Sequence, residues 1–366
     1  MRTDDTDEPI PEPQSLRLPD VDVSVRDASR RLRSAIEAVT AGRPAGSLQP
    51  AVERLGREYR AATAPREPVL ASRIDVAAYA VVRMPATFAA TWSALRQVRL
   101  ALGPARPARV LDVGAGTGAA SWAAADVFRP STVTLLEQQE LAIELGRSLA
   151  AQSASPALAA ASWHAWHLGR SGSDLPRADM VVSSYLLGEL DDAGRRRLVA
   201  SAARAAPLVV LVDAGTPAGF ARVVAARTQL LELGMSVVAP CTHAEPCPLA
   251  TTGDWCHFAA RLERSSLHRR LKGADLAYED EKFSFVAAAR DLDLDLDLDR
   301  GPSRIVRHPW IRKGMVSLEL CTSAGVLERR VVTRRQPAAF RAARDAHWGG
   351  TWPEPPARRD SPHGVP

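Results

Sequence analysis

Hydrophobic positions follow helical spacing in the first part of the chain. Leu32, Ile36 and Val39 recur every three or four residues, which predicts an amphipathic helix. A further predicted helix covers Ala77 to Leu95 and contains Pro85 near its middle. Because proline removes a backbone donor inside a helix, we expect this helix to bend or to restart there.

After residue 105 the pattern changes to short apolar runs that alternate with helical segments. The predicted strands are Arg109 to Val113, Val133 to Glu137, Asp179 to Ser184 and Leu208 to Asp213, with helices at Ala119 to Phe128 and Leu141 to Ala150. Such alternation is typical of a mostly parallel, doubly wound sheet, so the predicted fold class is α/β. Further along, Val316 to Thr322 and Leu327 to Thr333 are predicted to form a hairpin.

Pattern and composition together divide the chain into five regions. They are an acidic tail expected to be disordered (1–25), a helical N-terminal region (26–105), a Rossmann-like domain (106–235), a basic region with the cysteines that completes the sheet (236–350) and a proline-rich tail (351–366). The Asp–Leu alternation from Asp291 to Asp299 is expected to be a surface insertion, since its five carboxylates repel one another.

Two features bear on the compartment. No run of about 18 apolar residues occurs, which argues against a membrane-spanning helix. The first 12 residues hold five Asp or Glu against one Arg, the opposite of a secretory or mitochondrial leader. We therefore expect a cytoplasmic protein.

The basic charge is concentrated near the C-terminus. The whole chain has 47 Lys or Arg against 42 Asp or Glu, a net charge of +5, but 11 Lys or Arg stand against 3 Asp or Glu between Arg300 and Asp345. A genome rich in G and C explains the preference for Arg over Lys but not this clustering. A basic lobe indicates contact with nucleic acid.

A glycine loop joins the first predicted strand of the sheet to the helix that follows it. The loop reads Asp112-Val113-Gly114-Ala115-Gly116-Thr117-Gly118, and Glu137 ends the next strand 19 residues later. Glycines allow a ligand to approach the backbone, and a carboxylate at the end of the second strand accepts hydrogen bonds from ribose hydroxyls. We therefore predict a nucleotide site at Asp112, Gly114, Gly116, Gly118 and Glu137. A tight strand–helix turn without a ligand is the alternative.

This loop resembles that of class I S-adenosylmethionine-dependent methyltransferases. The resemblance is weaker where catalysis is expected. After the fourth strand the chain reads Ser183-Ser184-Tyr185-Leu186, without the prolines of an Asn-Pro-Pro-Tyr motif. The sequence therefore predicts binding of the cofactor and leaves the catalytic residues unknown.

Three of the four cysteines, Cys241, Cys247 and Cys256, fall within sixteen residues, and the fourth is Cys321. In a reducing compartment this clustering favours metal ligation over disulfides. Four thiolates satisfy either a tetrahedral zinc ion or a [4Fe–4S] cluster, although the spacing is not that of a zinc ribbon or a bacterial ferredoxin. Unlinked buried thiols are the alternative.

Several motifs together resemble one family, the ribosomal small-subunit Rsm-type methyltransferase-like proteins. Outside the glycine loop they are Arg83-Met84-Pro85-Ala86-Thr87, Ser184 to Leu190, Val212 to Gly219, Trp255-Cys256-His257-Phe258, Arg307-His308-Pro309, Leu320-Cys321-Thr322 and His347 to Pro353. The resemblance implies that Cys241, Cys247, Cys256 and Cys321 hold a [4Fe–4S] cluster. It also implies that the partner is the small ribosomal subunit, with Arg304, Arg307, Arg312 and Lys313 as candidates for contact with rRNA phosphates.

Three functions are compatible with these observations. The first is an rRNA methyltransferase, and the second is a non-catalytic ribosome assembly factor that keeps the methyltransferase fold. The third is a zinc-containing small-molecule methyltransferase, a function that gives no reason for the basic lobe.

Overall fold

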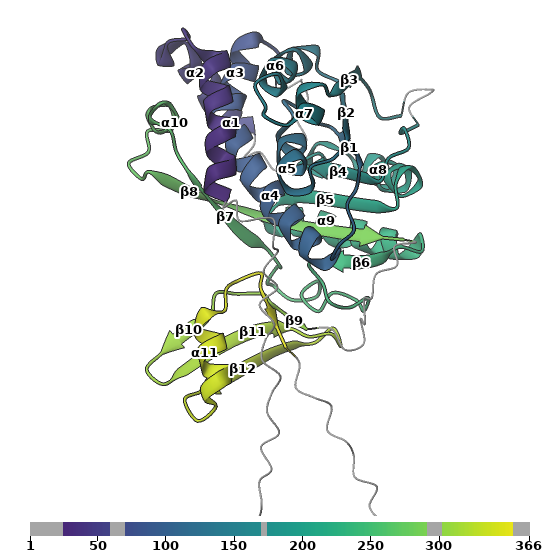
Figure 1. Ribbon diagram of the computed structural model, residues 1–366, viewed down its shortest axis with the longest axis vertical. Helices are drawn as coiled ribbons and strands as arrows, with labels where there is room; N and C mark the ends of the chain where they lie inside the picture. Colours follow the sequence, from purple (N-terminus) through teal and green to yellow (C-terminus); the bar gives the residue numbers. More distant parts are fainter. Residues whose placement is uncertain (1–24, 59–69, 170–173, 291–301, 354–366) are drawn as a thin grey trace, which may run out of the picture. The chain divides into compact units, whose positions relative to one another are not determined.

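The computed structural model describes residues 25–58, 70–169, 174–290 and 302–353 (Figure 1). The chain divides into two compact units, a smaller one with Cys241–Pro248 and the described part of Leu296–Pro366, and a larger one with Leu18–Pro240 and Leu249–Asp295. The Asp–Leu alternation and the two predicted tails, apart from residues 25 and 351–353, lie outside the described residues. No helix among the described residues is long and apolar enough to cross a membrane.

Four helices form the N-terminal part of the larger unit. They are α1 (Val25–Thr40), α2 (Ala45–Glu58), α3 (Arg73–Val82) and α4 (Met84–Ala101). The expected restart at the proline is confirmed, because Arg83 ends α3 and also caps α4, whose first turn contains Pro85. Proline fits there because the backbone N–H groups in the first turn of a helix have no partner within the helix, so the N–H that proline lacks is not missed.

An eight-stranded sheet forms the centre of the larger unit. Its strands are β1 (Arg109–Val113), β2 (Thr132–Glu137), β3 (Ser162–Ala165), β4 (Met180–Ser184), β5 (Leu208–Ala214), β6 (Ser236–Ala239), β7 (Phe258–Glu263) and β8 (Tyr278–Ala289). The order is β3-β2-β1-β4-β5-β8-β6, in which the first five are parallel and β8 is antiparallel to both neighbours. Beyond the end of β5, the long strand β8 continues and pairs with β7. The predicted α/β fold class, a mostly parallel sheet, is thereby confirmed.

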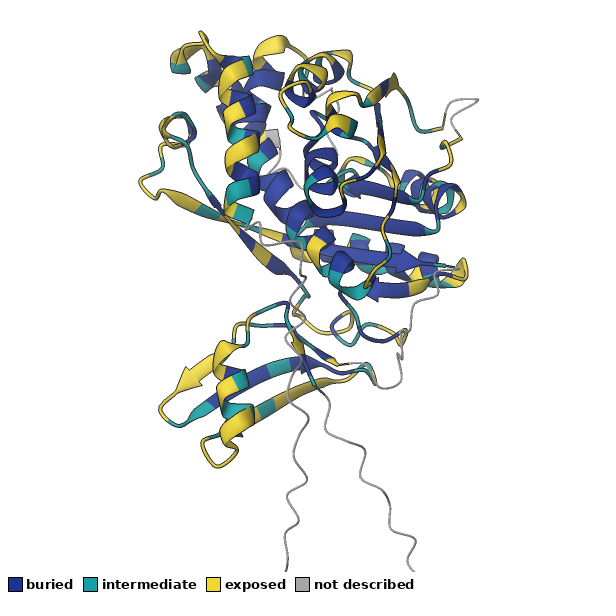
Figure 2. Cartoon of the chain, in the orientation of Figure 1, coloured by how far each residue is buried: buried dark blue, intermediate teal, exposed yellow. Residues whose placement is uncertain are grey.

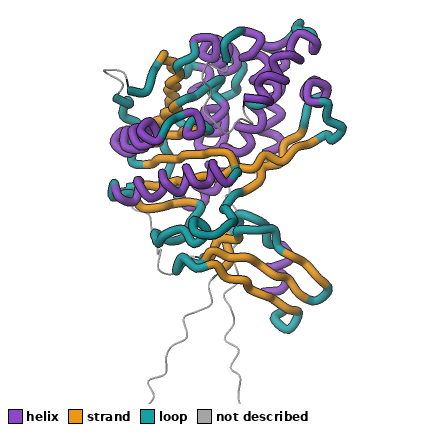
Figure 3. Tube along the Cα trace, turned by 180° about the vertical axis from the view of Figure 1, so that it is seen from behind, coloured by secondary structure: helices purple, strands orange, loops and turns teal. Residues whose placement is uncertain are grey.

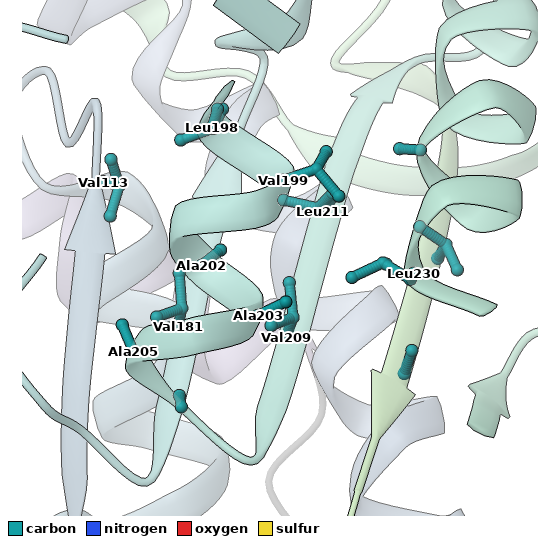
Figure 4. Close-up of a cluster of buried hydrophobic side chains, with 14 of the residues drawn as sticks. Val113, Val181, Leu198, Val199, Ala202, Ala203, Ala205, Val209, Leu211 and Leu230 are labelled. Carbon is teal, nitrogen blue, oxygen red and sulfur yellow. The ribbon is translucent and has the colours of Figure 1, made fainter. Parts of the chain in front are cut away.

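Helices cover both faces of this sheet, as Figure 3 shows from behind. They are α4, α5 (Ala119–Phe128), α6 (Glu140–Ala150), α7 (Pro156–Ala159), α8 (Asp192–Ala205) and α9 (Pro217–Glu232), with a short 3-10 turn, η1 (Leu187–Glu189). Helix α10 (Ser266–Lys272) packs against α2 and α3 instead. On one face, Val181, Val209 and Leu211 of the strands pack against α8 and α9 (Figure 4). Leu111 and Val113 of β1 also belong to this cluster, so the alternation of the strand turns the residue between them, Asp112, to the other face.

The smaller unit is a second sheet with one helix. It contains β9 (Ser303–Ile305), β10 (Trp310–Arg312), β11 (Met315–Cys321), β12 (Leu327–Thr333), β13 (Thr351–Trp352) and α11 (Pro337–Asp345). The predicted hairpin is confirmed as β11 and β12. Val316, Leu318 and Leu320 point to α11 and form the core with Val332. Figure 2 shows that β10 and much of β12 are exposed.

Candidate functional site

The glycine loop begins where β1 ends and stays close to β2. The backbone N–H groups of Gly114 and Ala115 both donate to the carbonyl of Leu136, at 2.9 and 3.0 Å. Gly114, Gly116 and Gly118 have φ angles of 70°, 55° and 91°, a region that side chains with a Cβ rarely adopt. The three glycines therefore permit a turn that places the backbone at the carboxyl edge of the sheet.

Only one of the three glycines faces open space. A Cβ on Gly114 would lie 2.7 Å from the side chain of Leu186, and one on Gly118 would lie 3.2 Å from the ring of Trp163. A Cβ on Gly116 would meet only the hydroxyl of Tyr79, at 3.9 Å. Packing thus explains Gly114 and Gly118, whereas the space beside Gly116 is room that a ligand can use.

Glu137 joins the glycine loop to the turn after β2. Its Oε2 accepts from the N–H of Gly116 at 2.7 Å, and its Oε1 accepts from the N–H groups of Gln138 and Gln139, both at 2.8 Å. Each carboxylate oxygen has two lone-pair sites, so with three bonds formed capacity remains on Oε2 for one hydroxyl donor. The structure thereby brings together two of the predicted site residues, Gly116 and Glu137.

Asp112 is fully buried on the opposite side of β1 from the α8–α9 core. Its Oδ2 accepts from the backbone N–H and the hydroxyl of Ser121, at 3.0 and 2.8 Å, so it satisfies a donor in the first turn of α5. Burial, aided by the charge of Glu137, raises the pKa of Asp112 to about 7 against the lowering effect of Ser121. The contacts in this structure make Asp112 a residue that positions the helix behind the loop.

A second group of polar residues lies near the end of β4, and sequence reasoning missed it. Tyr185 has a φ of 62°, and its hydroxyl donates to Glu281 at 2.9 Å. Arg83 approaches the same Glu281 oxygen at 3.4 Å from the end of α3. Burial and the charge of Glu281 raise the pKa of Tyr185 well above its usual value. The positive φ of Tyr185 and the hydrogen bond of its hydroxyl together make this loop a constrained turn after β4.

Two further groups carry shifted pKa values at this edge. Burial raises the pKa of Tyr79 to about 12. The pKa of Glu189 rises to about 7, first because protein atoms crowd its carboxyl and then because of the charges of Glu137 and Asp213. These directions show an acidic edge beside the glycine loop.

Asp213, at the end of β5, is 2% exposed and is neutralised by Arg222 of α9. The guanidinium is bidentate, with Nε and Nη2 at 2.6 and 3.2 Å from the two carboxylate oxygens. A Cβ on Gly188 would lie 3.3 Å from this guanidinium. The ion pair therefore also supports the turn after β4.

A cavity of about 1000 Å³ lies away from these residues. It is lined by Phe88, Trp122 and the loop at Ser131, which precedes β2. Because β1 and β2 are parallel, the cavity is at the amino end of the strands and the glycine loop is at the carboxyl end. We assign it no part in the candidate nucleotide site.

The cysteines are divided between the two units. Cys241, Cys247 and Cys321 belong to the smaller one, where Nε2 of buried His243 lies 3.2 Å from Sγ of buried Cys321. Cys256 belongs to the larger one, and its carbonyl accepts from the hydroxyl of Ser284 at 2.7 Å. Among the residues that the structure describes, no group of three or more His, Cys, Asp or Glu has the arrangement of a metal site. The predicted metal centre therefore stays a prediction.

The four predicted phosphate-binding residues differ in their surroundings. Arg304 and Arg307 are half-buried and donate to the backbone carbonyls of Gly349 and Val306, at 2.7 and 2.6 Å. Arg312 and Lys313 are exposed, and the Arg312 guanidinium lies 3.9 Å from the centre of the Trp310 ring. Exposure therefore favours Arg312 and Lys313 as contacts for a partner.

Comparison with known proteins finds relatives named for ribosome assembly and for Rsm22. The human ribosome assembly protein METTL17, mitochondrial, is 27% identical over 293 residues, which are 75% of this chain and 62% of the human protein. The mitochondrial Rsm22-cox11 tandem protein 2 of Schizosaccharomyces pombe is 24% identical over 334 residues, 76% of this chain and 43% of that protein. The chain thus spans less than two thirds of either relative.

A likeness in fold alone is found with the magnesium protoporphyrin IX methyltransferase of Synechocystis PCC 6803 with bound SAM. The two are 12% identical, with a TM-score of 0.39 over 69% of this chain and 99% of that one.

The family comparison covers both the sheet with its glycine loop and the smaller unit. The model described as mitochondrial small ribosomal subunit Rsm22 matches residues 73–353, well over half of the chain. The resemblance found in the sequence is thereby confirmed, and this protein belongs to the Rsm22 family.

Proposed function

We propose that this protein is a methyltransferase-like factor that binds S-adenosylmethionine at its glycine loop and the rRNA of the small ribosomal subunit during assembly. The observation that carries the cofactor part is the open space beside Gly116 together with the 2.7 Å contact between its N–H and Glu137. The family supports the ribosomal part. When bound, the cofactor supplies an electrophilic methyl group.

The residues at this edge fit the cofactor in three ways. The backbone at Gly116 leaves room for a ligand that no side chain fills. Glu137 keeps acceptor capacity on Oε2 for one ribose hydroxyl. Asp112, through Ser121, fixes the start of α5, whose N-terminus favours polar or negative groups of the ligand.

The turn after β4 favours a factor that does not catalyse transfer. Leu186 packs against Gly114, and the hydroxyl of Tyr185 is engaged by Glu281. In this arrangement neither side chain offers a base for an attacking amine, although the Tyr185 oxygen can still accept a hydrogen bond. We therefore propose that binding of the cofactor is the primary property of this protein. Transfer of the methyl group to rRNA is measured with labelled methyl groups.

Titration calorimetry of the full chain with S-adenosylmethionine tests the cofactor proposal. We expect the wild type to bind and Glu137→Gln to bind about tenfold more weakly or worse, since a charge-assisted hydrogen bond contributes about 1.5–3 kcal/mol. Glu144→Gln is the matched control, because Glu144 is exposed on α6 and pairs with Arg73. A wild type that does not bind the cofactor contradicts the proposal.

Sedimentation with purified small subunits tests the ribosomal part, and labelled methyl groups distinguish the two modes. Binding without incorporation into rRNA supports the assembly factor. Incorporation supports the methyltransferase. A chain that binds neither subunits nor their RNA contradicts the ribosomal proposal.

We also propose that Cys241, Cys247, Cys256 and Cys321 hold a [4Fe–4S] cluster with a structural role. Three of the four lie in one unit, and the contact between His243 and Cys321 gathers two side chains of metal-binding type. Protein purified without oxygen should contain iron and acid-labile sulfide, and Cys321→Ser should lose both while its neighbour control Thr322→Ser keeps them. One zinc without sulfide contradicts the cluster.

The compartment stays a prediction as well. We expect the cytoplasm, whereas the relatives carry the word mitochondrial in their names. Fractionation of the source cells with an antibody against this chain tests it.

A further inference from the structure

The sheet of the smaller unit has one face that α11 does not cover. Val316, Leu318 and Leu320 point to α11, so the alternation of β11 turns Ser317, Glu319 and Cys321 to the other face. Directly across from Ser317, the neighbouring strands place Trp310 on one side and Val331 on the other. These three residues form a cross-strand row on the uncovered face.

The two ends of this face differ. At the Cys321 end, the segment Cys241–Pro248 lies over the sheet, as the contact of His243 with Cys321 shows. A Cβ on Gly325 would also lie 2.7 Å from Glu245 of that segment. At the other end, Trp310 and Val331 are 51% and 47% exposed. Five of the nine exposed large hydrophobic residues in the described chain belong to this small unit, so the exposure is concentrated here.

The exposed end is also positively charged. Arg312 stacks on Trp310, and Lys313 occupies the turn that follows. Arg334 lies against that turn, since its N–H donates to the carbonyl of Gly314 at 3.1 Å, and Arg335 comes next. The chain contains no Asp or Glu from Arg307 to Leu318 or from Val331 to Arg344. The acid on this face, Glu319, is paired with Arg329 at 3.2 Å.

This combination has a specific chemical use. An exposed aromatic ring on a sheet provides a surface on which an unpaired base stacks, and nearby cations contact the flanking phosphates. Stacking requires a base with a free face, which a base inside a duplex lacks. An acidic peptide would match the positive charge of this face but would not require an exposed, flat aromatic ring.

We propose that a platform on this face binds an unpaired segment of RNA, a proposal that rests on the proposed rRNA partner. The platform consists of Trp310, Arg312, Lys313, Val331, Arg334 and Arg335. A base stacks on Trp310, and the backbone of the RNA runs past Lys313 and Arg334. This unit therefore recognises single-stranded rather than double-helical RNA.

Fluorescence anisotropy with the full chain tests the platform. The probes are a labelled single-stranded RNA of about 12 nucleotides and the same sequence closed into a hairpin, a length within the site sizes of such surfaces. We expect tighter binding to the single strand, about tenfold weaker binding by Trp310→Ala and recovery of most of it by Trp310→Phe. Lys313→Ala should reduce the salt dependence of binding instead.

Tyr278→Ala is the matched control. Tyr278 is an exposed aromatic residue under Arg261, 4.2 Å away, but it belongs to the larger unit and its arginine is neutralised by Asp280. Because Trp310 is exposed, Trp310→Ala should keep the thermal unfolding profile and the cofactor affinity of the wild type.

Three results would overturn the inference. They are equal single-strand affinity of Trp310→Ala and wild type, preference for the hairpin, and preference for an acidic peptide over RNA. A wild type that binds neither RNA also removes the proposed RNA partner, whereas the calorimetric result with S-adenosylmethionine stands apart from all of these.

Discussion

Asp112 offers a quantitative test of the candidate site, because its carboxyl titrates near pH 7, where few carboxyl groups of proteins do. Its pKa is about 7 in the folded chain and near 3.8 in the unfolded one. A raised pKa stabilises the fold at low pH, and this contribution is lost as the pH rises through the folded value. For these two values, linkage predicts a loss of about 2.5 kcal/mol between pH 5 and pH 8.

The perturbation is Asp112→Asn, which keeps an acceptor for Ser121 and removes the titration. Urea unfolding of both proteins at pH 5, 6, 7 and 8 gives the free energy of unfolding at each pH. We expect the wild type to lose about 2.5 kcal/mol relative to the variant over this range. Ser121→Ala in the wild-type background should make the loss larger, since its hydrogen bonds lower the pKa of Asp112. Parallel curves for wild type and Asp112→Asn would refute the reasoning.

Three other substitutions test the surroundings of the site by urea unfolding. Arg222→Ala should cost about 3 kcal/mol, because it leaves Asp213 charged and buried, and an equally stable variant would show that the pair is dispensable. Gly219→Ala should cost about 3 kcal/mol, because its Cβ would lie 2.0 Å from the carbonyl oxygen of Ala214, whereas Gly253→Ala meets nothing within 4 Å and should be neutral. Tyr185→Phe should cost about 1 kcal/mol through loss of the bond to Glu281, and a larger loss would indicate packing instead.

Local pattern was sufficient to predict the core of the fold. The strands from Arg109 to Val113 and from Leu208 onward are short apolar runs bounded by polar residues, and the glycine loop with Glu137 has a fixed spacing. These features are visible because neighbouring residues determine them. The restart of the helix at Pro85 was predictable for the same reason.

The second polar group could not be found in this way. Arg83 and Glu281 meet although 198 residues separate them, and Tyr185 reaches Glu281 across 96 residues. Only the position of β8 beside β5 brings them together. The role of Asp112 was also hidden, because an acid before a glycine loop serves a ligand or a helix terminus equally well in sequence. In this structure its Oδ2 accepts from Ser121 of α5, a contact that the sequence did not predict.

Strand β11 limits where amino acids can be inserted or deleted during the evolution of this protein. It carries Cys321 at one end and the partner of Trp310 at the other, with an apolar residue at alternate positions between them. Inserting one amino acid within the strand would invert every later side chain, so the thiol would turn inward and a leucine outward. Length variation among relatives should therefore be confined to the connections at either end, and the positions of Cys321 and of the residue opposite Trp310 must be inherited together.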